Sequence, residues 1–172
     1  MIKRIKHTDL SPAEAEELHH HIQSEFGHVP FVQRHTWAQP DWSFIKYEND
    51  KVATFYNVML RDVSMDGATH KIAGVNNVIT PKEYRGKGYA TELLRATEQF
   101  IFDELGCKYG LLLCADALLP FYSRLGWYTV NSTLYYQQPT GKQLYDSNVM
   151  LLSPEGQPRI APELMDLNGL PW

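Results

Sequence analysis

The apolar positions near the N-terminus predict a strand followed by a helix. Ile2 and Ile5 lie in a short apolar-alternating stretch, which favours a strand. Further on, the apolar side chains recur every three or four residues and predict a helix from about residue 12 to 26 with one buried face. These side chains are Ala15, Leu18, Ile22 and Phe26. Ser11, Pro12 and Glu14 have the pattern of a capping box at the helix start, and Gly27 is placed to end it.

The next part of the chain changes from an irregular to a strand-like pattern. Residues 27–41 contain Pro30 and Pro40, and we expect a long loop there that is functional or mobile. Three segments rich in β-branched and aromatic residues follow: Trp42 to Tyr47, Val52 to Val63 and Ala68 to Ile79. The sequences Asn49-Asp50 and Met65-Asp66-Gly67 between them are typical of hairpin turns. The pattern therefore predicts three antiparallel strands.

The second half alternates between helix and strand patterns. We expect a helix from about residue 89 to 105 that ends at Gly106, a buried strand over Tyr109 to Cys114, and a short helix over Ala117 to Leu125. Later strands are expected at Trp127 to Asn131, Leu134 to Gln138 and Val149 to Leu152. This order predicts an α/β (α+β) fold, in which helices pack on one mixed, mostly antiparallel sheet, within one domain over residues 1–172.

Composition narrows the class of protein. The chain has 172 residues, 44% of them hydrophobic, which is enough for a core without disulfides or a structural metal. Cys107 and Cys114 bracket a core-like strand, so we expect reduced thiols and a cytoplasmic location. With 16 Lys+Arg against 20 Asp+Glu the net charge is −4, which argues against nucleic acid and suits a cationic small molecule. No apolar run approaches the roughly 18 residues of a membrane span.

A glycine-rich turn is the first candidate for chemistry. Arg85-Gly86-Lys87-Gly88-Tyr89-Ala90 stands between the strand segment Asn76 to Thr80 and the helix that begins near residue 89. Unpaired N–H groups at a helix start bind phosphate oxygens, and glycine lets a ligand approach the backbone closely. The turn lacks the Gly-Lys-Ser/Thr of a nucleoside-triphosphate loop and the spacing of a dinucleotide fingerprint. Taken alone, it is equally compatible with a plain structural turn.

Two motifs together resemble the GCN5-related N-acetyltransferase superfamily. Arg85, Gly88 and Ala90 resemble its acyl-CoA-binding signature, and Phe121 to Trp127 is similar to its second signature, an aromatic-tyrosine pair before a glycine and an aromatic residue. The motifs occur in the family's order and cover about Asn76 to Asn131. The resemblance implies the acyl-CoA N-acyltransferase fold, with helices on both faces of a sheet that is splayed in the middle. It also implies acetyl-CoA as co-substrate and no metal.

The resemblance assigns roles to individual residues. The main chain of three residues would hold the pantetheine arm and the acetyl carbonyl, namely Val78, Ile79 and Thr80. The turn residues would hold the pyrophosphate, namely Arg85, Gly86, Lys87, Gly88, Tyr89 and Ala90. A neutral amine would attack the thioester, a backbone N–H would stabilise the oxyanion, and Tyr122 would protonate the departing thiolate. The alternative for Tyr122 is a buried aromatic residue whose hydroxyl is satisfied.

A narrower resemblance points to the aminoglycoside 2′-N-acetyltransferase branch. It is carried by Gly126-Trp127, Pro139-Thr140-Gly141, Glu163-Leu164-Met165 and the final Trp172. It implies an aminoglycoside as the small-molecule amine, a role in antibiotic resistance, and a Trp172 carboxylate that anchors the cationic acceptor. A Trp172 that only packs is the alternative. Trp37, in a polar loop, is placed at the acceptor mouth.

One position departs from that branch, because Asn76 stands where the branch carries a glutamate that helps to deprotonate the substrate amine through water. Asn76 would then only contact the acceptor. Either the Trp172 carboxylate or a histidine of the 28–35 loop supplies the base, or the acceptor is less cationic, as kasugamycin is. A protein or peptide amine as acceptor, and a non-catalytic acyl-CoA-binding module, are the rival functions. The sequence leaves open whether the protein is a monomer or a homodimer.

Overall fold

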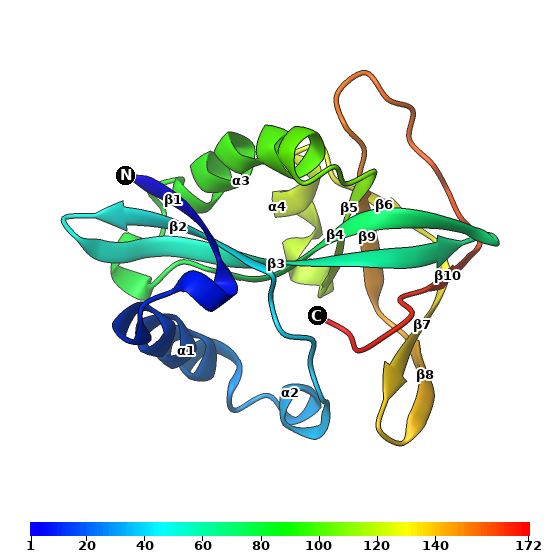
Figure 1. Ribbon diagram of the computed structural model, residues 1–172, viewed down its shortest axis with the longest axis horizontal. Helices are drawn as coiled ribbons and strands as arrows, with labels where there is room; N and C mark the ends of the chain where they lie inside the picture. The colour runs from blue at the N-terminus through cyan, green and yellow to red at the C-terminus, as the bar shows by residue number, and fades with distance from the viewer. The chain divides into compact units, whose positions relative to one another are not determined.

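The computed structural model describes residues 1–172 as a mixed sheet with helices (Figure 1). The strands are β1 (Ile2–Lys6), β2 (Trp42–Glu48), β3 (Lys51–Met65), β4 (Ala68–Ile79), β5 (Tyr109–Cys114), β6 (Tyr128–Val130), β7 (Thr133–Gln138), β8 (Gly141–Tyr145), β9 (Asn148–Leu152) and β10 (Leu164–Asp166). The helices are α1 (Pro12–Phe26), α2 (Pro30–Arg34), α3 (Tyr89–Gln99) and α4 (Leu119–Ser123). Short 3-10 turns cover His7–Asp9, Lys82–Tyr84 and Asp116–Leu118, and a π-helical turn over Phe100–Glu104 follows α3.

The strand order is β6-β9-β5-β4-β3-β10-β7-β8, and β2 pairs with both β1 and β3. The pairs β4–β5 and β7–β10 are parallel, whereas β1–β2, β2–β3, β3–β10, β5–β9, β6–β9 and β7–β8 are antiparallel. The predicted mixed, mostly antiparallel sheet with helices is therefore confirmed. None of the helices is both long and apolar enough to cross a lipid bilayer.

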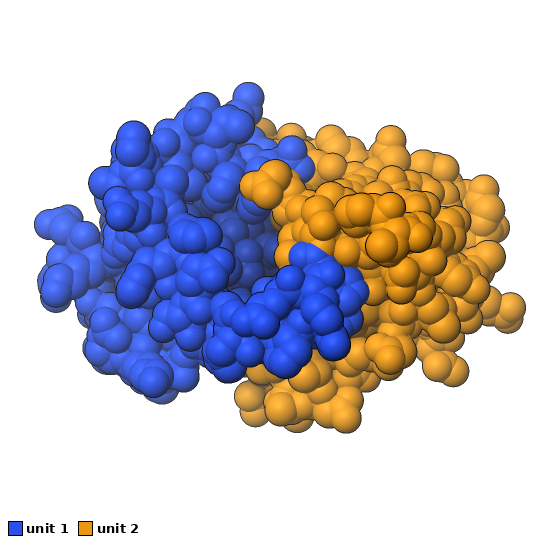
Figure 2. Space-filling view, turned by 90° about the horizontal axis from the view of Figure 1, so that it is seen from below, with its two compact units in different colours: residues 1–35, 40–58, 76–97 blue, residues 36–39, 59–75, 98–172 orange.

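The residues form two compact units that share some elements (Figure 2). Unit 1 contains residues 1–35, 40–58 and 76–97, and unit 2 contains residues 36–39, 59–75 and 98–172. Strands β3 and β4 and helix α3 each have residues in both units. Each unit has an apolar cluster of its own.

In unit 1, α1 and α3 cover opposite faces of β3. Leu18 of α1 packs with Ile45 and Phe55, all at most 1% exposed. The side chain of Tyr56 points the other way and its hydroxyl group bonds Thr97 of α3. Neighbouring residues of a strand face opposite sides, so this alternation of Phe55 and Tyr56 positions the two helices.

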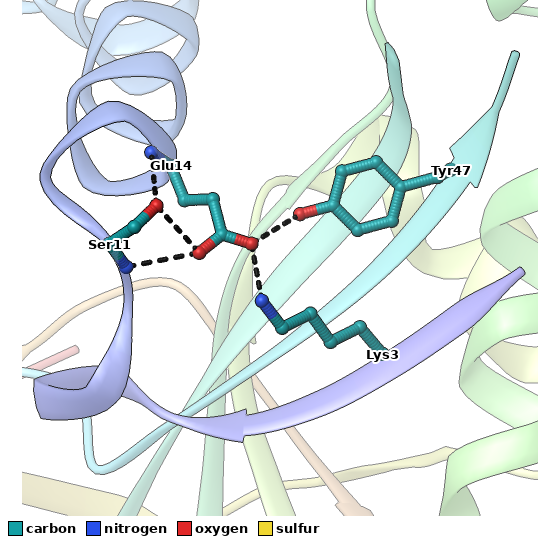
Figure 3. Close-up of polar contacts among 4 residues, drawn as sticks. All are labelled: Lys3, Ser11, Glu14 and Tyr47. Carbon is teal, nitrogen blue, oxygen red and sulfur yellow. Dashed lines mark hydrogen bonds and ion pairs between the residues drawn. The ribbon is translucent and has the colours of Figure 1, made fainter. Parts of the chain in front are cut away.

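The start of α1 is fixed by the predicted capping box. The Ser11 hydroxyl accepts a 3.3 Å bond from the Glu14 backbone N–H, and the Glu14 carboxylate accepts from the Ser11 backbone N–H at 3.0 Å. The same carboxylate also accepts bonds from Tyr47 and Lys3 (Figure 3). The cap thereby ties α1 to strands β1 and β2.

The core of unit 2 includes the indole of Trp172, which is 4% exposed. Its Nε1 donates a 3.3 Å bond to the carbonyl of Leu111, and the Arg61 guanidinium carbon lies 5.3 Å from its ring centroid. Gly74 faces the same ring, because a Cβ atom at this position would collide with the indole. The close approach of Trp172 to β4 therefore requires glycine at residue 74.

Several elements differ from the sequence predictions. The expected loop over 27–41 contains α2, whose Pro30 occupies the first helical position. Ala15 is exposed, so the buried face of α1 is narrower than its spacing indicated. The expected helix to residue 105 changes to a π-helical turn after Gln99, in which the Leu105 N–H bonds the Phe100 carbonyl at 3.0 Å. Strands β8 and β10 were not predicted at all.

Candidate active site

The open edge of β4 is the first part of the candidate site. The parallel ladder between β4 and β5 runs from Ile72↔Tyr109 to Val75↔Leu112 and ends there. Strand β4 continues to Ile79, and Asn77 within this continuation has a φ of 51°, which interrupts the regular strand. The backbone groups on this edge after Val75 therefore have no partner in β5. An unpaired strand edge can bind an extended ligand through its main chain.

The residues expected to hold the pantetheine arm lie on this edge. The Thr54 hydroxyl donates a 2.9 Å bond to the Ile79 carbonyl and lies 2.9 Å from the Thr80 hydroxyl. The Arg85 Nε atom donates to the Thr80 carbonyl at 2.9 Å. Two of the three carbonyls in Val78 to Thr80 thus already accept hydrogen bonds within unit 1. The N–H groups of this segment are the better candidates for ligand contacts.

The glycine-rich turn joins this edge to the start of α3. Gly86 and Gly88 have φ values of 78° and 76°, a conformation that other L-residues rarely adopt. No atom lies within 4 Å of where a Cβ atom at Gly88 would be, so the space above the backbone is open. The Glu92 N–H bonds the Gly88 carbonyl at 3.0 Å as α3 begins, and the preceding N–H groups belong to the unpaired first turn. The turn therefore offers backbone donors and the positive end of a helix dipole to an anion.

The two cationic side chains of the turn are paired within unit 1. Arg85 Nη2 lies 2.8 Å from Oε2 of Glu25 on α1. Lys87 Nζ lies 3.7 Å from Oε2 of Glu48, and 5.1 Å and 5.8 Å from the ring centroids of Tyr84 and Tyr89. Both cationic side chains are half-exposed and lie beside the acidic partners Glu25 and Glu48, which no sequence spacing indicated.

Tyr122 lies on α4 in unit 2, where it is 6% exposed. Its ring contacts Trp127 edge-on with 6.2 Å between the ring centroids, and its carbonyl accepts a 3.2 Å bond from the Trp127 N–H. Burial raises the pKa of the Tyr122 hydroxyl well above its ordinary value, and the nearby Cys114 thiol adds to this increase. Tyr122 is therefore a neutral phenol, able to donate a proton, throughout the physiological range.

The expected acceptor residues Trp37, Asn76 and Trp172 occupy three different settings. Asn76, on the open edge of β4, has a buried Oδ1 atom that lacks a hydrogen-bond partner. Trp37 belongs to the segment 36–39, which Gln138 holds through two 2.9 Å bonds to the main-chain N–H and carbonyl of Thr36. The neighbouring Ala38 N–H bonds the Pro171 carbonyl at 2.8 Å. Trp172 itself has its indole in the core of unit 2.

The histidines and cysteines show no metal-binding cluster. No group of three or more His, Cys, Asp or Glu side chains lies close enough together to hold a metal ion. In the segment that was expected to supply a base, the Nδ1 atom of His35 lies 2.7 Å from the Phe31 carbonyl, and its ring stacks on Phe31. Cys107 and Cys114 are free and buried, and burial raises the pKa of the Cys107 thiol to about 11.

Residues that resembled the aminoglycoside branch have local structural roles. Pro139 and Thr140 form the two-residue turn between β7 and β8, with Gln138 paired to Gly141. Leu164 and Met165 form most of β10, and the Asp66 carboxylate accepts bonds from the N–H groups of Glu163 and Leu164. A hairpin turn in one segment, and strand pairing with bonds to Asp66 in the other, describe their local roles.

Known proteins resemble this chain both by family and by fold. A family model described as "Acetyltransferase (GNAT) domain" matches residues 8–130. No curated protein matches the sequence. Similar solved structures include Escherichia coli ElaA, which has a TM-score of 0.63 and 15% sequence identity over 89% of this chain and 99% of that chain.

Two further similar structures are complexes with CoA or acetyl-CoA. The GNAT family N-acetyltransferase YhbS from Escherichia coli, in complex with CoA, has a TM-score of 0.61 and 15% identity over 98% of this chain and 89% of that chain. A GNAT family acetyltransferase from Brucella melitensis, in complex with acetyl-CoA, has a TM-score of 0.59 and 15% identity over 95% of this chain and 94% of that chain. At these identities the likeness concerns the fold alone.

Proposed function

The chain belongs to the family of GNAT acetyltransferase domains, and on that premise we propose that it transfers the acetyl group of acetyl-CoA to an amine of a small molecule. One observation carries the proposal: the open edge of β4 leads, through a 3-10 turn and then a glycine turn, to the start of α3, all within unit 1. A pantetheine arm needs main-chain partners along an extended path, and a pyrophosphate needs clustered N–H donors. Residues 76–90 provide these two features in the required order.

The proposed assignment divides the cofactor between the two features. The main chain of Val78 to Thr80 would bind the pantetheine arm and the acetyl carbonyl. The backbone amides of Arg85 to Ala90 would bind the pyrophosphate, and their open surface at Gly86 and Gly88 leaves room for its oxygens. Acetyl-CoA serves as a co-substrate, and the proposed chemistry needs no metal.

The chemical step is a direct transfer. The nitrogen of the neutral amine forms a bond to the thioester carbonyl carbon, and an N–H on the β4 edge stabilises the oxyanion that develops. The carbon–sulfur bond then breaks, and Tyr122 gives its proton to the departing thiolate. Tyr122 regains a proton from the nitrogen of the product, directly or through solvent. The raised pKa of Tyr122 keeps the hydroxyl protonated until the thiolate forms.

The acceptor is proposed to be an aminoglycoside, with its 2′-amine as nucleophile. The net charge of −4 favours a cationic molecule, and Trp37, Asn76 and Trp172 are the residues we assign to acceptor binding. Asn76 carries no charge, which favours an acceptor with few cationic groups at that point, such as kasugamycin. No carboxylate stands at residue 76 to take the proton of an ammonium group.

A thiol-release assay with acetyl-CoA tests the proposal. The acceptors would be kanamycin B, tobramycin, kasugamycin, spermidine and a lysine-containing peptide, with the Tyr122→Phe variant as the control for enzyme-dependent release. If the wild type turns over an aminoglycoside and Tyr122→Phe does not, the result supports both the function and the acceptor class. Turnover with the peptide alone would replace the small-molecule acceptor by a protein, and release with none of them would overturn catalysis in favour of a binding module.

A further inference from the structure

A line of three polar side chains runs from the end of β1 to β3 in unit 1; Ser43 and Asn57 are buried, and His7 is partly buried. Ser43 on β2 and Asn57 on β3 are register partners, and both side chains are 0% exposed. The Ser43 hydroxyl donates a 2.8 Å bond to Oδ1 of Asn57. The Nδ1 atom of His7 lies 2.8 Å from the same hydroxyl oxygen.

These bonds are mutually consistent when the Asn57 amide turns Oδ1 towards Ser43. A serine hydroxyl has one hydrogen, so a hydroxyl that donates to Asn57 accepts from His7, and Nδ1 of His7 carries its proton. Burial lowers the pKa of His7, which keeps the ring neutral. With Oδ1 bonded to Ser43, Nδ2 of Asn57 is the amide atom that lacks a partner.

Two buried polar atoms next to this line lack partners. Nδ2 of Asn57 is a donor without an acceptor, and Oδ1 of Asn76 is an acceptor without a donor. Leaving such an atom unpaired is unfavourable, because it gives up its hydrogen bonds to water on folding. More than about 90% of buried polar groups in folded proteins have a partner. One unpaired donor and one unpaired acceptor therefore indicate a binding site for a group that bonds both.

Counting outward from the turn between β3 and β4 places Asn57 and Asn76 at matching positions of the two strands. Residues equally distant from a two-residue turn lie opposite each other in an antiparallel pair. Asn57 and Asn76 are each eight residues from Met65 and Ala68, which flank the turn. The bond from Thr54 to the Ile79 carbonyl, three residues further along each strand, shows that the strands still run side by side at this level.

We propose that Asn57 and Asn76 together bind one O–H group, whose oxygen accepts from Nδ2 of Asn57 and whose hydrogen is donated to Oδ1 of Asn76. An ammonium group cannot accept a hydrogen bond and a carboxylate cannot donate one, so neither satisfies both atoms. The O–H belongs either to a hydroxyl group of the acceptor or to a water molecule that the acceptor then contacts. This inference rests on the proposed acetyl transfer.

The site would select the acceptor by its hydroxyl groups. Asn76 lies two residues before Val78, where the segment that we assign to the acetyl group and pantetheine arm begins. A hydroxyl bound there would fix the acceptor next to the reacting carbonyl. A site that binds an O–H through buried polar atoms discriminates strongly against an analogue that lacks it, because the two protein atoms lose their partner.

Acceptors that differ by one hydroxyl test the site and identify the source of the O–H. Tobramycin is kanamycin B without the 3′-hydroxyl next to the 2′-amine, and spermidine has no hydroxyl group. In Asn57→Leu, which removes the donor, a fall in kcat/KM of at least tenfold for kanamycin B, with less than threefold change for tobramycin, assigns the O–H to the acceptor. An equal fall for all three assigns it to water, and unchanged kcat/KM for all three would overturn the site.

Two variants separate this effect from a loss of stability. Thr97→Val removes a buried hydroxyl that bonds Tyr56, on the opposite face of β3, and should lower the melting temperature without changing the preference among acceptors. Ser43→Ala leaves the Asn57 donor in place but frees its orientation. It should therefore raise the KM of the preferred acceptor less than Asn57→Leu does, with kcat nearly unchanged.

A crystal structure of the protein provides a readout that does not depend on turnover. An oxygen atom within hydrogen-bond distance of both Asn57 Nδ2 and Asn76 Oδ1 supports the site. Direct contact between the two amides, or no density between them, would overturn it. If the wild type shows no turnover but an oxygen is bound between the two asparagines, the proposed function is wrong and the proposed O–H site still stands.

Discussion

The hydroxyl group of Tyr89 donates a 2.5 Å hydrogen bond to Oε1 of Glu48. This bond lowers the pKa of the Glu48 carboxyl and raises the pKa of Tyr89 to about 12, so the carboxylate keeps its charge. Lys87 lies 3.7 Å from the other carboxylate oxygen. A fixed negative charge therefore lies beside the turn that we propose binds pyrophosphate.

Neutralising Glu48 should strengthen CoA binding. Glu48→Gln keeps the bond from Tyr89 but removes the charge that repels phosphate and holds Lys87. Because charge pairs at the surface are weak and screened by salt, we expect the Kd for CoA to fall by only about threefold to fivefold at low salt, and less at high salt. Asp166→Asn, which breaks the pair with Lys142 in unit 2, makes the same change in net charge and should leave the Kd unaltered. Weaker or unchanged binding in Glu48→Gln would contradict the prediction.

A side chain at Gly88 should block CoA without unfolding the protein. Asparagine tolerates a positive φ better than most residues, so Gly88→Asn mainly fills the open space above the turn. The Kd for CoA should rise at least about tenfold, equivalent to about 1.4 kcal/mol. Gly67→Asn in the β3–β4 turn, where φ is 83° and the space is also open, is the matched control. Isothermal titration showing equal Kd values for the two variants would remove the turn from the site.

Removal of the Tyr122 hydroxyl should affect turnover but not cofactor binding. Tyr122→Phe keeps the ring that packs against Trp127, so the Kd for acetyl-CoA should stay within about twofold while kcat falls on the order of 10²-fold. Tyr136→Phe alters another buried tyrosine of unit 2 and should leave kcat nearly unchanged. A kcat in Tyr122→Phe within threefold of the wild type would exclude proton donation by this residue.

The raised pKa of Tyr122 also predicts the pH profile. The amine must be neutral to attack, so kcat/KM should rise with pH until the amine is deprotonated. Tyr122 loses its proton only above the ordinary tyrosine pKa of about 10, so no decline in rate from its ionisation should occur below about pH 9.5. A descending limb near pH 8 that disappears in Tyr122→Phe would show that the hydroxyl ionises too easily for this role.

Acid should weaken the contact between α1 and the first strands. The bond from Lys3, with further bonds from Ser11 and Tyr47, lowers the pKa of Glu14 from 4.5 to about 2 (Figure 3). Since the folded pKa lies below the unfolded one, this stabilisation is complete above about pH 4.5 and is lost as the pH falls towards 2. Glu14→Gln should lower the free energy of unfolding by about 0.5–1 kcal/mol at pH 7 and not at pH 2, a small effect because the group is near the surface.

Urea denaturation at both pH values measures the Glu14 effect. Glu16→Gln removes a charge from an exposed position of the same helix and serves as the control. An equal loss at both pH values in Glu14→Gln would mean that shape, not charge, explains the contribution of this residue.

The contact between Gly74 and Trp172 should show compensation. Gly74→Ala forces a methyl group against the indole and should cost about 1–3 kcal/mol of unfolding free energy. Trp172→Phe vacates part of that space, so the double variant should be more stable than the sum of the single effects. If chemical denaturation gives additive losses of unfolding free energy, the backbone at residue 74, and not the ring of residue 172, moves to accommodate the methyl group. If Trp172→Phe raises the KM for the acceptor and leaves the KM for acetyl-CoA unchanged, the result would support the proposed role of Trp172 in acceptor binding.

The sequence was most informative where local conformation decides the structure. The turn residues Asn49, Asp50, Asp66 and Gly67 all have positive φ, so the two hairpins were predictable from residue type. Helix α2 has only five residues, too few to show a period. Strand β8 is mostly exposed and has no buried face, and β10 has three residues positioned by pairing with β3 and β7. These elements depend on tertiary partners that a local pattern does not contain.

The same distinction applies to the candidate site. Gly86 and Gly88 were found because a turn at a helix start needs their backbone freedom and leaves a trace in the sequence. The contribution of Glu48 depends on where the end of β2 lies relative to the turn. His7, Ser43 and Asn57 meet only because β1, β2 and β3 adopt a particular register. No spacing rule relates residues that different strands bring together.

The division into two units has a consequence for the gene. Each unit draws on three separate stretches of the chain, and the four residues 36–39 belong to unit 2 although unit 1 supplies the residues on both sides. Recombination with a distant relative at any point between residues 36 and 78 would therefore exchange parts of both apolar clusters at once. Crossovers after residue 98 would exchange only material of unit 2, and we expect functional chimaeras to tolerate them better.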